Sequence, residues 1–151
     1  QIIKGTQGHL MDCTAALMNS SLGSHYFQSK ESARKAVEEG LNHGTLFVAL
    51  ADDVCTGFMY YIENGAFHSF PLLHLLAVKE AYRGQGIGKR LLGYFEELSA
   101  RNKFFLVVAD FNPDAKRFYE NNGYCQVGEI PGLYRDGITE YLMMKKYLIK
   151  L

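Results

Sequence analysis

The stretch from residue 72 to residue 124 constrains the fold more than any other part of the chain. Residues 72–78 form a short, continuous apolar run, which favours a central strand buried on both faces. A glycine-rich loop follows at residues 79–86, and apolar residues then recur at helical spacing. They are Ile87, Leu91, Leu92, Phe95 and Leu98. Residues 104–109 predict a second buried strand, parallel to the first because a crossover helix joins them.

The loop before this helix has the composition of an anion site. Its centre consists of Gly84, Gln85, Gly86, Ile87 and Gly88. Glycines lack a side chain, so successive N–H groups can converge on one point. The N-terminus of the next helix adds unpaired donors and a favourable dipole. With Arg83 and Lys89 on either side, the sequence predicts a phosphate or pyrophosphate site at residues 85–89.

Three phosphate-binding patterns compete for this loop. A P-loop requires Ser or Thr after its lysine, and Arg90 stands there instead. A dinucleotide fingerprint starts at Gly84 and Gly86 but meets Lys89 at its last position, although Asp110 lies where a ribose-binding acid is expected. A dinucleotide-binding domain therefore stays an alternative. The third pattern, R/Q-x-x-G-x-G/A, is complete from Arg83 to Gly88.

A second motif lies downstream, where residues 112–124 read N-x-x-A-x-x-F-Y-E-x-x-G-Y. Together the two segments resemble motifs A and B of the GCN5-related N-acetyltransferases, the GNAT superfamily. The resemblance implies a single α/β domain over residues 1–151. It also implies a mixed, strongly twisted sheet of six or seven strands flanked by about four helices. Acetyl-CoA would be the co-substrate, attacked directly by a primary amine in a ternary complex, with no metal.

The resemblance carries roles for individual residues. Backbone N–H groups at residues 76–78 would meet pantetheine and the thioester carbonyl. Asn112 suits a helix cap before Pro113 and, by resemblance, also a pantetheine ligand. Tyr119 would assist the departing sulfur, the alternative being a core aromatic beside Phe118. The predicted donor-binding residues are Leu76, Ala77, Val78, Arg83, Gly84, Gln85, Gly86, Ile87, Gly88, Lys89, Asn112 and Tyr119.

His74 is the candidate general base. A histidine within an apolar strand costs free energy unless it is hydrogen-bonded, and its usual pKa of about 6.5 suits proton transfer. The strand resembles that of the arylalkylamine N-acetyltransferases, which carry two histidines in an H-x-H pattern. Here His74 holds the second position of that pattern, whereas Leu72 holds the first. A structural histidine is the alternative. Glu63, His68 or a water relay are weaker candidates for the base.

The acceptor is expected to be a primary amine of a small molecule or peptide. Val107 stands where protein N-terminal acetyltransferases of this superfamily carry a glutamate, which weakens a protein-N-terminus hypothesis. Residues 9–22 and 31–41 predict two helices, separated by a break at residues 23–30. Either the helices simply cover the sheet, or they and the loop between them wall the acceptor site. A non-catalytic acyl-CoA sensor remains an alternative from another functional class.

The rest of the chain predicts short antiparallel strands. Residues 1–4 form a possible strand, residues 45–50 and 54–62 a hairpin, and residues 63–65 a second turn. Residues 124–129 and 138–147 predict the last two strands.

Composition excludes several other functional classes. The formal net charge is zero, so no overall field attracts nucleic acid or a membrane surface. No apolar stretch is long enough to span a bilayer. Cys13, Cys55 and Cys125 are scattered, which predicts buried thiols, a reducing compartment and a cytoplasmic location. A monomer or homodimer is expected, and the compact layout suggests a bacterial protein.

Overall fold

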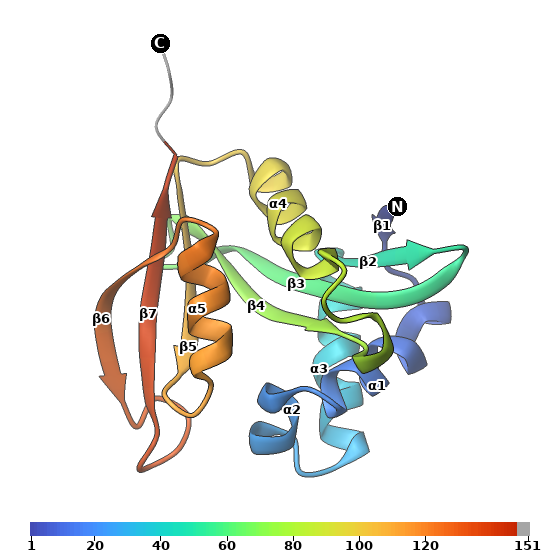
Figure 1. Cartoon of the computed structure of the whole chain (residues 1–151), viewed down its shortest axis with the longest axis horizontal. Helices are drawn as coiled ribbons and strands as arrows, with labels where there is room; N and C mark the ends of the chain where they lie inside the picture. The colour runs from blue at the N-terminus through green and yellow to red at the C-terminus, as the bar shows by residue number, and fades with distance from the viewer. Residues whose placement is uncertain (148–151) are drawn as a thin grey trace. The chain divides into compact units, whose positions relative to one another are not determined.

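A computed structural model describes residues 1–147 of the chain. Seven strands form the predicted mixed sheet, and their order is β1-β2-β3-β4-β5-β7-β6 (Figure 1). The strands are β1 Ile2–Lys4, β2 Leu46–Ala51, β3 Val54–Ala66, β4 Phe70–Val78, β5 Lys103–Ala109, β6 Cys125–Pro131 and β7 Thr139–Lys146. The helices are α1 Leu10–Met18, α2 Ser21–Tyr26, α3 Lys30–His43, α4 Ile87–Ser99 and α5 Pro113–Asn121, with short 3-10 turns η1 Gln7–His9 and η2 Glu80–Tyr82.

The chain divides into two compact units. The first unit contains Gln1–Ile62 and Leu73–Ser99, and the second contains Glu63–Leu72 and the described residues from Ala100 onward. Strands β3 and β4 therefore contribute residues to both units. That residues 1–151 form one domain stays a prediction, and its last four residues lie outside the described chain.

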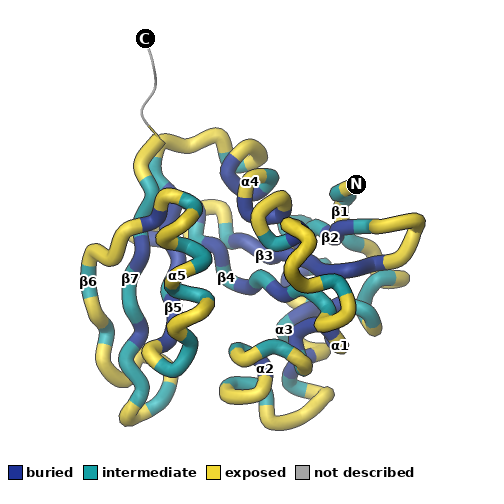
Figure 2. The backbone as a smooth tube through the Cα atoms, in the orientation of Figure 1, coloured by how far each residue is buried: buried dark blue, intermediate teal, exposed yellow. Residues whose placement is uncertain are grey.

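The first unit buries a core between its strands and helices α1 and α3. Strands β1, β2 and β3 pair antiparallel, and the buried stretches of β2 and β3 are dark blue in Figure 2. The core on this side comprises Cys13, Ala16, Leu17, Ala33, Val37, Leu46, Val48, Cys55, Phe58, Tyr60, Leu75 and Ala77. Aromatic contacts link the strands to α4 as well, with 5.5 Å between the rings of Phe47 and Tyr94 and 5.4 Å between those of Tyr61 and Phe95.

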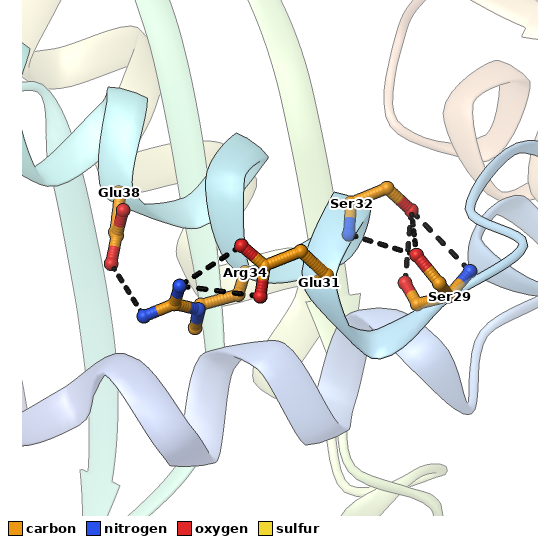
Figure 3. A network of polar contacts seen from close by, with 5 residues as sticks. All are labelled: Ser29, Glu31, Ser32, Arg34 and Glu38. Atoms are coloured by element: carbon orange, nitrogen blue, oxygen red, sulfur yellow. Dashed lines mark hydrogen bonds and ion pairs between the residues drawn. The ribbon is translucent and has the colours of Figure 1, made fainter.

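Helix α4 has the amphipathic pattern that the sequence predicted, with one exception. Ile87, Leu91, Leu92 and Phe95 are buried, whereas Leu98 in the last turn is 40% exposed. Helix α3 begins at a reciprocal cap between Ser29 and Ser32 (Figure 3). On its exposed side Arg34 bridges Glu31 at 3.0 Å and Glu38 at 3.2 Å.

The second unit is built on β5, β7 and β6. Strand β7 pairs antiparallel with both neighbours, and β4 joins β5 in parallel at Leu72 and Phe105, as predicted. The turn predicted at residues 63–65 is wrong, because β3 continues to Ala66 and turns at Phe67 and His68, which have φ of 56° and 58°. The rings of Phe67 and Phe70 lie 5.5 and 5.6 Å from that of Phe105, and these contacts fix the later turn.

Three other expectations need correction. The helix predicted over residues 9–22 is two helices, and the predicted break at residues 23–30 contains most of α2. Strand β4 is fully buried on one face only. Pro71, Leu73, Leu75 and Ala77 are buried, whereas Leu72, His74, Leu76 and Val78 are half-buried. Cys125 is exposed, while Cys13 and Cys55 are buried thiols. No helix in the described part of the chain is both long and apolar enough to cross a membrane.

Two helix glycines provide a matched test of the packing between α3 and β3. A Cβ atom at Gly40 would lie 2.8 Å from Cγ of Tyr60, whereas one at Gly93 on α4 meets nothing within 4 Å. Gly93→Ala should stabilise the protein by up to about 1 kcal/mol, because alanine favours helix. Gly40→Ala should instead destabilise it by about 1–3 kcal/mol through overpacking. Urea denaturation measures both; an unchanged or raised midpoint for Gly40→Ala would contradict the packing.

Candidate functional site

The loop between β4 and α4 has the backbone that the glycine pattern predicted. Gly84 and Gly86 have φ of 78° and 81°, conformations that side chains rarely adopt. Helix α4 begins at Ile87, and the N–H group of Arg90 donates to the carbonyl oxygen of Gly86 at 3.1 Å. The N–H groups of the preceding residues, including Gly88 and Lys89, therefore start the helix without partners in the α-helical ladder.

The space over this loop is open. A Cβ atom added at Gly84 or Gly86 would meet no other atom within 4 Å. Gln85 and Lys89 are exposed, and the first turn of α4 contains no acidic residue. Unpaired N–H groups, a nearby cation and open space are the properties of an anion site.

The side chain of Arg83 contacts two backbone carbonyl groups. Its Nε donates to the oxygen of Val78 at 3.1 Å, and its Nη2 donates to the oxygen of Asn19 at 3.0 Å. The first is the last residue of β4 and the second is the C-cap of α1. Arg83 thus connects the loop to two other elements of the first unit.

Lys79 makes a similar connection at the start of the loop. Its backbone N–H donates to the oxygen of Thr56 at 2.8 Å, and its Nζ pairs with Oδ1 of Asp12 on α1 at 2.5 Å. Strand β3 lies close to the same end of β4, since a Cβ atom at Gly57 would lie 2.8 Å from the oxygen of Ala77. The backbone at residues 76–78 is therefore held from the β3 side.

His74 lies on the half-buried face of β4, against a polar cluster. Its ring meets that of Tyr60 edge-on, with 5.4 Å between the ring centroids. The hydroxyl of Tyr60 donates to Oε2 of Glu39 at 2.9 Å, so His43, whose Nδ1 is 2.9 Å from the hydroxyl oxygen, must be the donor there. Burial lowers the pKa of His74 below its usual value, and the charge of Glu39 partly offsets this effect.

Asn112 and Tyr119 belong to the second unit, on α5. Oδ1 of Asn112 accepts from the N–H group of Ala115 at 3.3 Å and Pro113 follows it, so the predicted cap is confirmed. The ring of Tyr119 packs against Phe118 and Tyr124, with centroids 5.2 and 5.9 Å away. Burial raises the pKa of Tyr119 above its usual range, so the hydroxyl stays protonated at neutral pH.

Comparison with known proteins identifies the family. Residues 42–126, more than half of the chain, match the family model described as acetyltransferase (GNAT) domain. The chain belongs to the GNAT acetyltransferase family. An uncharacterized N-acetyltransferase of Methanocaldococcus jannaschii is 40% identical over 75 residues, which cover 47% of this chain and 48% of that protein. The chain spans only about a fifth to a half of the length of the first curated relatives it matches.

Solved GNAT structures have the same fold. A GNAT-family acetyltransferase from Bacillus cereus superposes with a TM-score of 0.81 at 21% identity, covering 98% of this chain and 97% of that one. An aminoglycoside 6′-N-acetyltransferase complexed with coenzyme A gives 0.80 at 21% identity, covering 100% and 99%.

The predicted GNAT site residues fall into two groups. Residues 76–78, Arg83, the glycine loop and His74 lie in the first unit, whereas Asn112 and Tyr119 lie in the second. Sequence reasoning missed the contacts from α1 to the loop, because nothing local marks Asp12 or Asn19 as partners of that loop. Glu39 and His43 did carry a signal, since residues four apart lie on one helix face.

The environment of His74 predicts a pH effect on stability. The unfolded chain takes up this proton near pH 6.5, whereas the folded chain takes it up only at lower pH. The unfolded state therefore binds more protons as pH falls through about 6.5, and stability decreases. Between about pH 7.5 and 5.5, His74→Asn should lose less stability than the wild type. His68→Asn, at an exposed turn, is the control; equal slopes for the wild type and His74→Asn would refute the prediction.

Proposed function

We propose that this protein is an acetyl-CoA-dependent N-acetyltransferase that acetylates a primary amine of a small molecule or peptide. The observation that carries the proposal is the loop at Gly84 and Gly86, whose two left-handed glycines lead into unpaired N–H groups at the start of α4. In a chain of the GNAT family, this arrangement suits the pyrophosphate of coenzyme A.

The donor would be held mainly by backbone groups. The amides of residues 85–89 and the charge of Lys89 would bind pyrophosphate, with the charge of Arg83 nearby. The backbone of residues 76–78 would bind pantetheine and the thioester carbonyl. The Nδ2 group of Asn112 would donate to pantetheine while Oδ1 keeps its capping bond to Ala115.

The transfer joins the amine nitrogen to the thioester carbon and breaks the carbon–sulfur bond. An alkylamine has a pKa of about 10 and a thiol about 8.5, so the amine must lose a proton and the thiolate must be stabilised. Because its pKa is raised, Tyr119 suits hydrogen-bond donation to the departing sulfur better than complete proton transfer. No acyl-enzyme is needed when the amine attacks directly.

His74 is the proposed base, acting on the amine or on a water beside it. A lowered pKa keeps the imidazole neutral at neutral pH, the state in which it can accept a proton. The same shift makes it a weaker base, which favours a proton relay to solvent. Glu63 and His68, the weaker candidates, are exposed and belong to the second unit, whereas His74 belongs to the first.

The proposal that the acceptor is an amine of a small molecule or peptide rests on similar solved structures alone. One neighbouring structure is an aminoglycoside 6′-N-acetyltransferase, and another is an Arabidopsis thaliana Naa50 in complex with the bisubstrate analogue CoA-Ac-MVNAL. Both support an amine acceptor, one a small molecule and the other a peptide. We also propose that the protein is bacterial and cytoplasmic and that it is a monomer or a homodimer.

Two alternatives remain, the first distinguished by turnover and the second by ligand binding. A non-catalytic sensor would bind acetyl-CoA without turnover. A dinucleotide-binding protein would use Asp110, but Oδ2 of that residue already accepts from the N–H group of Thr139 at 3.1 Å. This contact favours a structural role for Asp110.

Calorimetry with acetyl-CoA tests the donor site. Gly86→Glu should weaken binding by about 100-fold or more, because a carboxylate would face the pyrophosphate. Gly86→Ala separates backbone strain from charge and should weaken binding less. Gly93→Glu adds the same side chain on the exposed face of α4 and should bind like the wild type. A wild type that binds NAD but not acetyl-CoA would overturn the proposal.

Tyr119→Phe tests the chemistry once an amine panel has identified an acceptor. We expect kcat to fall by about 10- to 100-fold, because the hydrogen bond to the departing thiolate is lost, while acetyl-CoA binding is retained. Thiol release measures the rate. Phe118→Leu, a change on the same helix that keeps the phenol, is the control. An unchanged kcat would leave Tyr119 as a packing residue only.

A further inference from the structure

Arg83 is exposed, yet its guanidinium is committed to the protein itself. Its bonds to Val78 and Asn19 join the last carbonyl of β4 to the C-cap carbonyl of α1. The carbonyl groups at the end of a helix lack partners in the helix ladder, and a cation is favoured there by the helix dipole. A planar guanidinium can donate in two directions at once, which a lysine ammonium does less well.

The α1 end of this contact is coupled directly to α2. Oγ of Ser20 donates to the oxygen of Leu17 at 2.6 Å and accepts from the N–H group of Gly23 at 2.9 Å. A Cβ atom at Gly23 would lie only 1.7 Å from the same oxygen of Leu17, so α2 starts in direct contact with the last turn of α1. A displacement of Asn19 is therefore passed on to α2.

A second contact keeps α1 in register with the loop. Lys79 pairs with Asp12 in the first turn of α1, while Arg83 binds its C-cap. These contacts are separated by about 10 Å along the helix axis. The short turn η2 lies between Lys79 and Arg83 in the sequence, so the whole start of the loop is attached to α1.

We propose that Arg83 is a positioning residue that links the donor-binding loop to the corner between α1 and α2, so that donor binding orders residues 19–26. This inference rests on the proposed function, in which the loop at Gly84 and Gly86 binds acetyl-CoA. The role differs from direct binding of pyrophosphate by the Arg83 side chain, which requires charge alone.

Hydrogen–deuterium exchange of the full chain without ligand tests the link itself. Arg83→Ala and Arg83→Lys should both exchange severalfold faster than the wild type at residues 19–26. Arg101→Ala is the matched control, because Arg101 also donates to a backbone carbonyl, that of Ser69 at 3.1 Å, and to Oδ1 of Asn64 at 3.1 Å, but in the second unit. Wild-type exchange at residues 19–26 in both Arg83 variants would overturn the proposal.

Adding acetyl-CoA tests the transmission. In the wild type it should slow exchange both in the loop and at residues 19–26. In Arg83→Lys, which keeps the charge, it should protect the loop but no longer residues 19–26. Equal protection of residues 19–26 in Arg83→Lys would overturn the proposal. If the wild type fails to bind acetyl-CoA, the proposed function fails, whereas the ligand-free comparison still decides whether Arg83 makes the link.

Discussion

The site depends on how the chain leaves β4 at Val78 and enters α4 at Ile87. Two residues between these points have left-handed backbone conformations, and flexible glycines there cost conformational entropy when they are fixed. The loop has little packing of its own, since its glycines face open space. Its shape therefore depends on the contacts of Lys79 and Arg83, which attach its first half to α1, β3 and β4. A binding loop can stay open in this way and still be preorganised.

The need to hold the start of this loop in place also explains the irregular pairing of β3. The pairing register of β2 with β3 shifts between Ala49 and Leu50, where β3 contains one extra residue, Thr56. The side-chain hydroxyl of Thr56 donates to the backbone oxygen of Ala49. The bulge precedes Gly57, whose lack of a side chain lets β3 approach the oxygen of Ala77. The carbonyl of Thr56 then receives the N–H group of Lys79. The bulge thus brings β3 into contact with the end of β4 and the start of the loop.

Local signals predicted the parts of the fold that local physics decides. The glycine loop, the apolar stripe of α4 and the Asn112 cap follow from backbone preference, helical period and capping chemistry, and all three are present. Tertiary contacts overrode local signals elsewhere. The turn residues at positions 63–65 stay in β3, where Arg101 binds Asn64 and aromatic rings pack at the true turn. The contacts of Arg83 and Lys79 to α1 join residues far apart in sequence, so no local pattern contains them.

Burial favours the neutral form of both His74 and Tyr119, each within its own unit. Burial disfavours the charged form, which raises the pKa of Tyr119 and lowers that of His74. A neutral imidazole can accept a proton but holds it weakly, and a neutral phenol can donate a hydrogen bond without giving up its proton. Catalysis by such groups would rely on hydrogen bonds and on solvent as the final proton acceptor. An acceptor amine that reaches His74 already deprotonated would then react fastest, which favours amines with pKa values below that of a simple alkylamine.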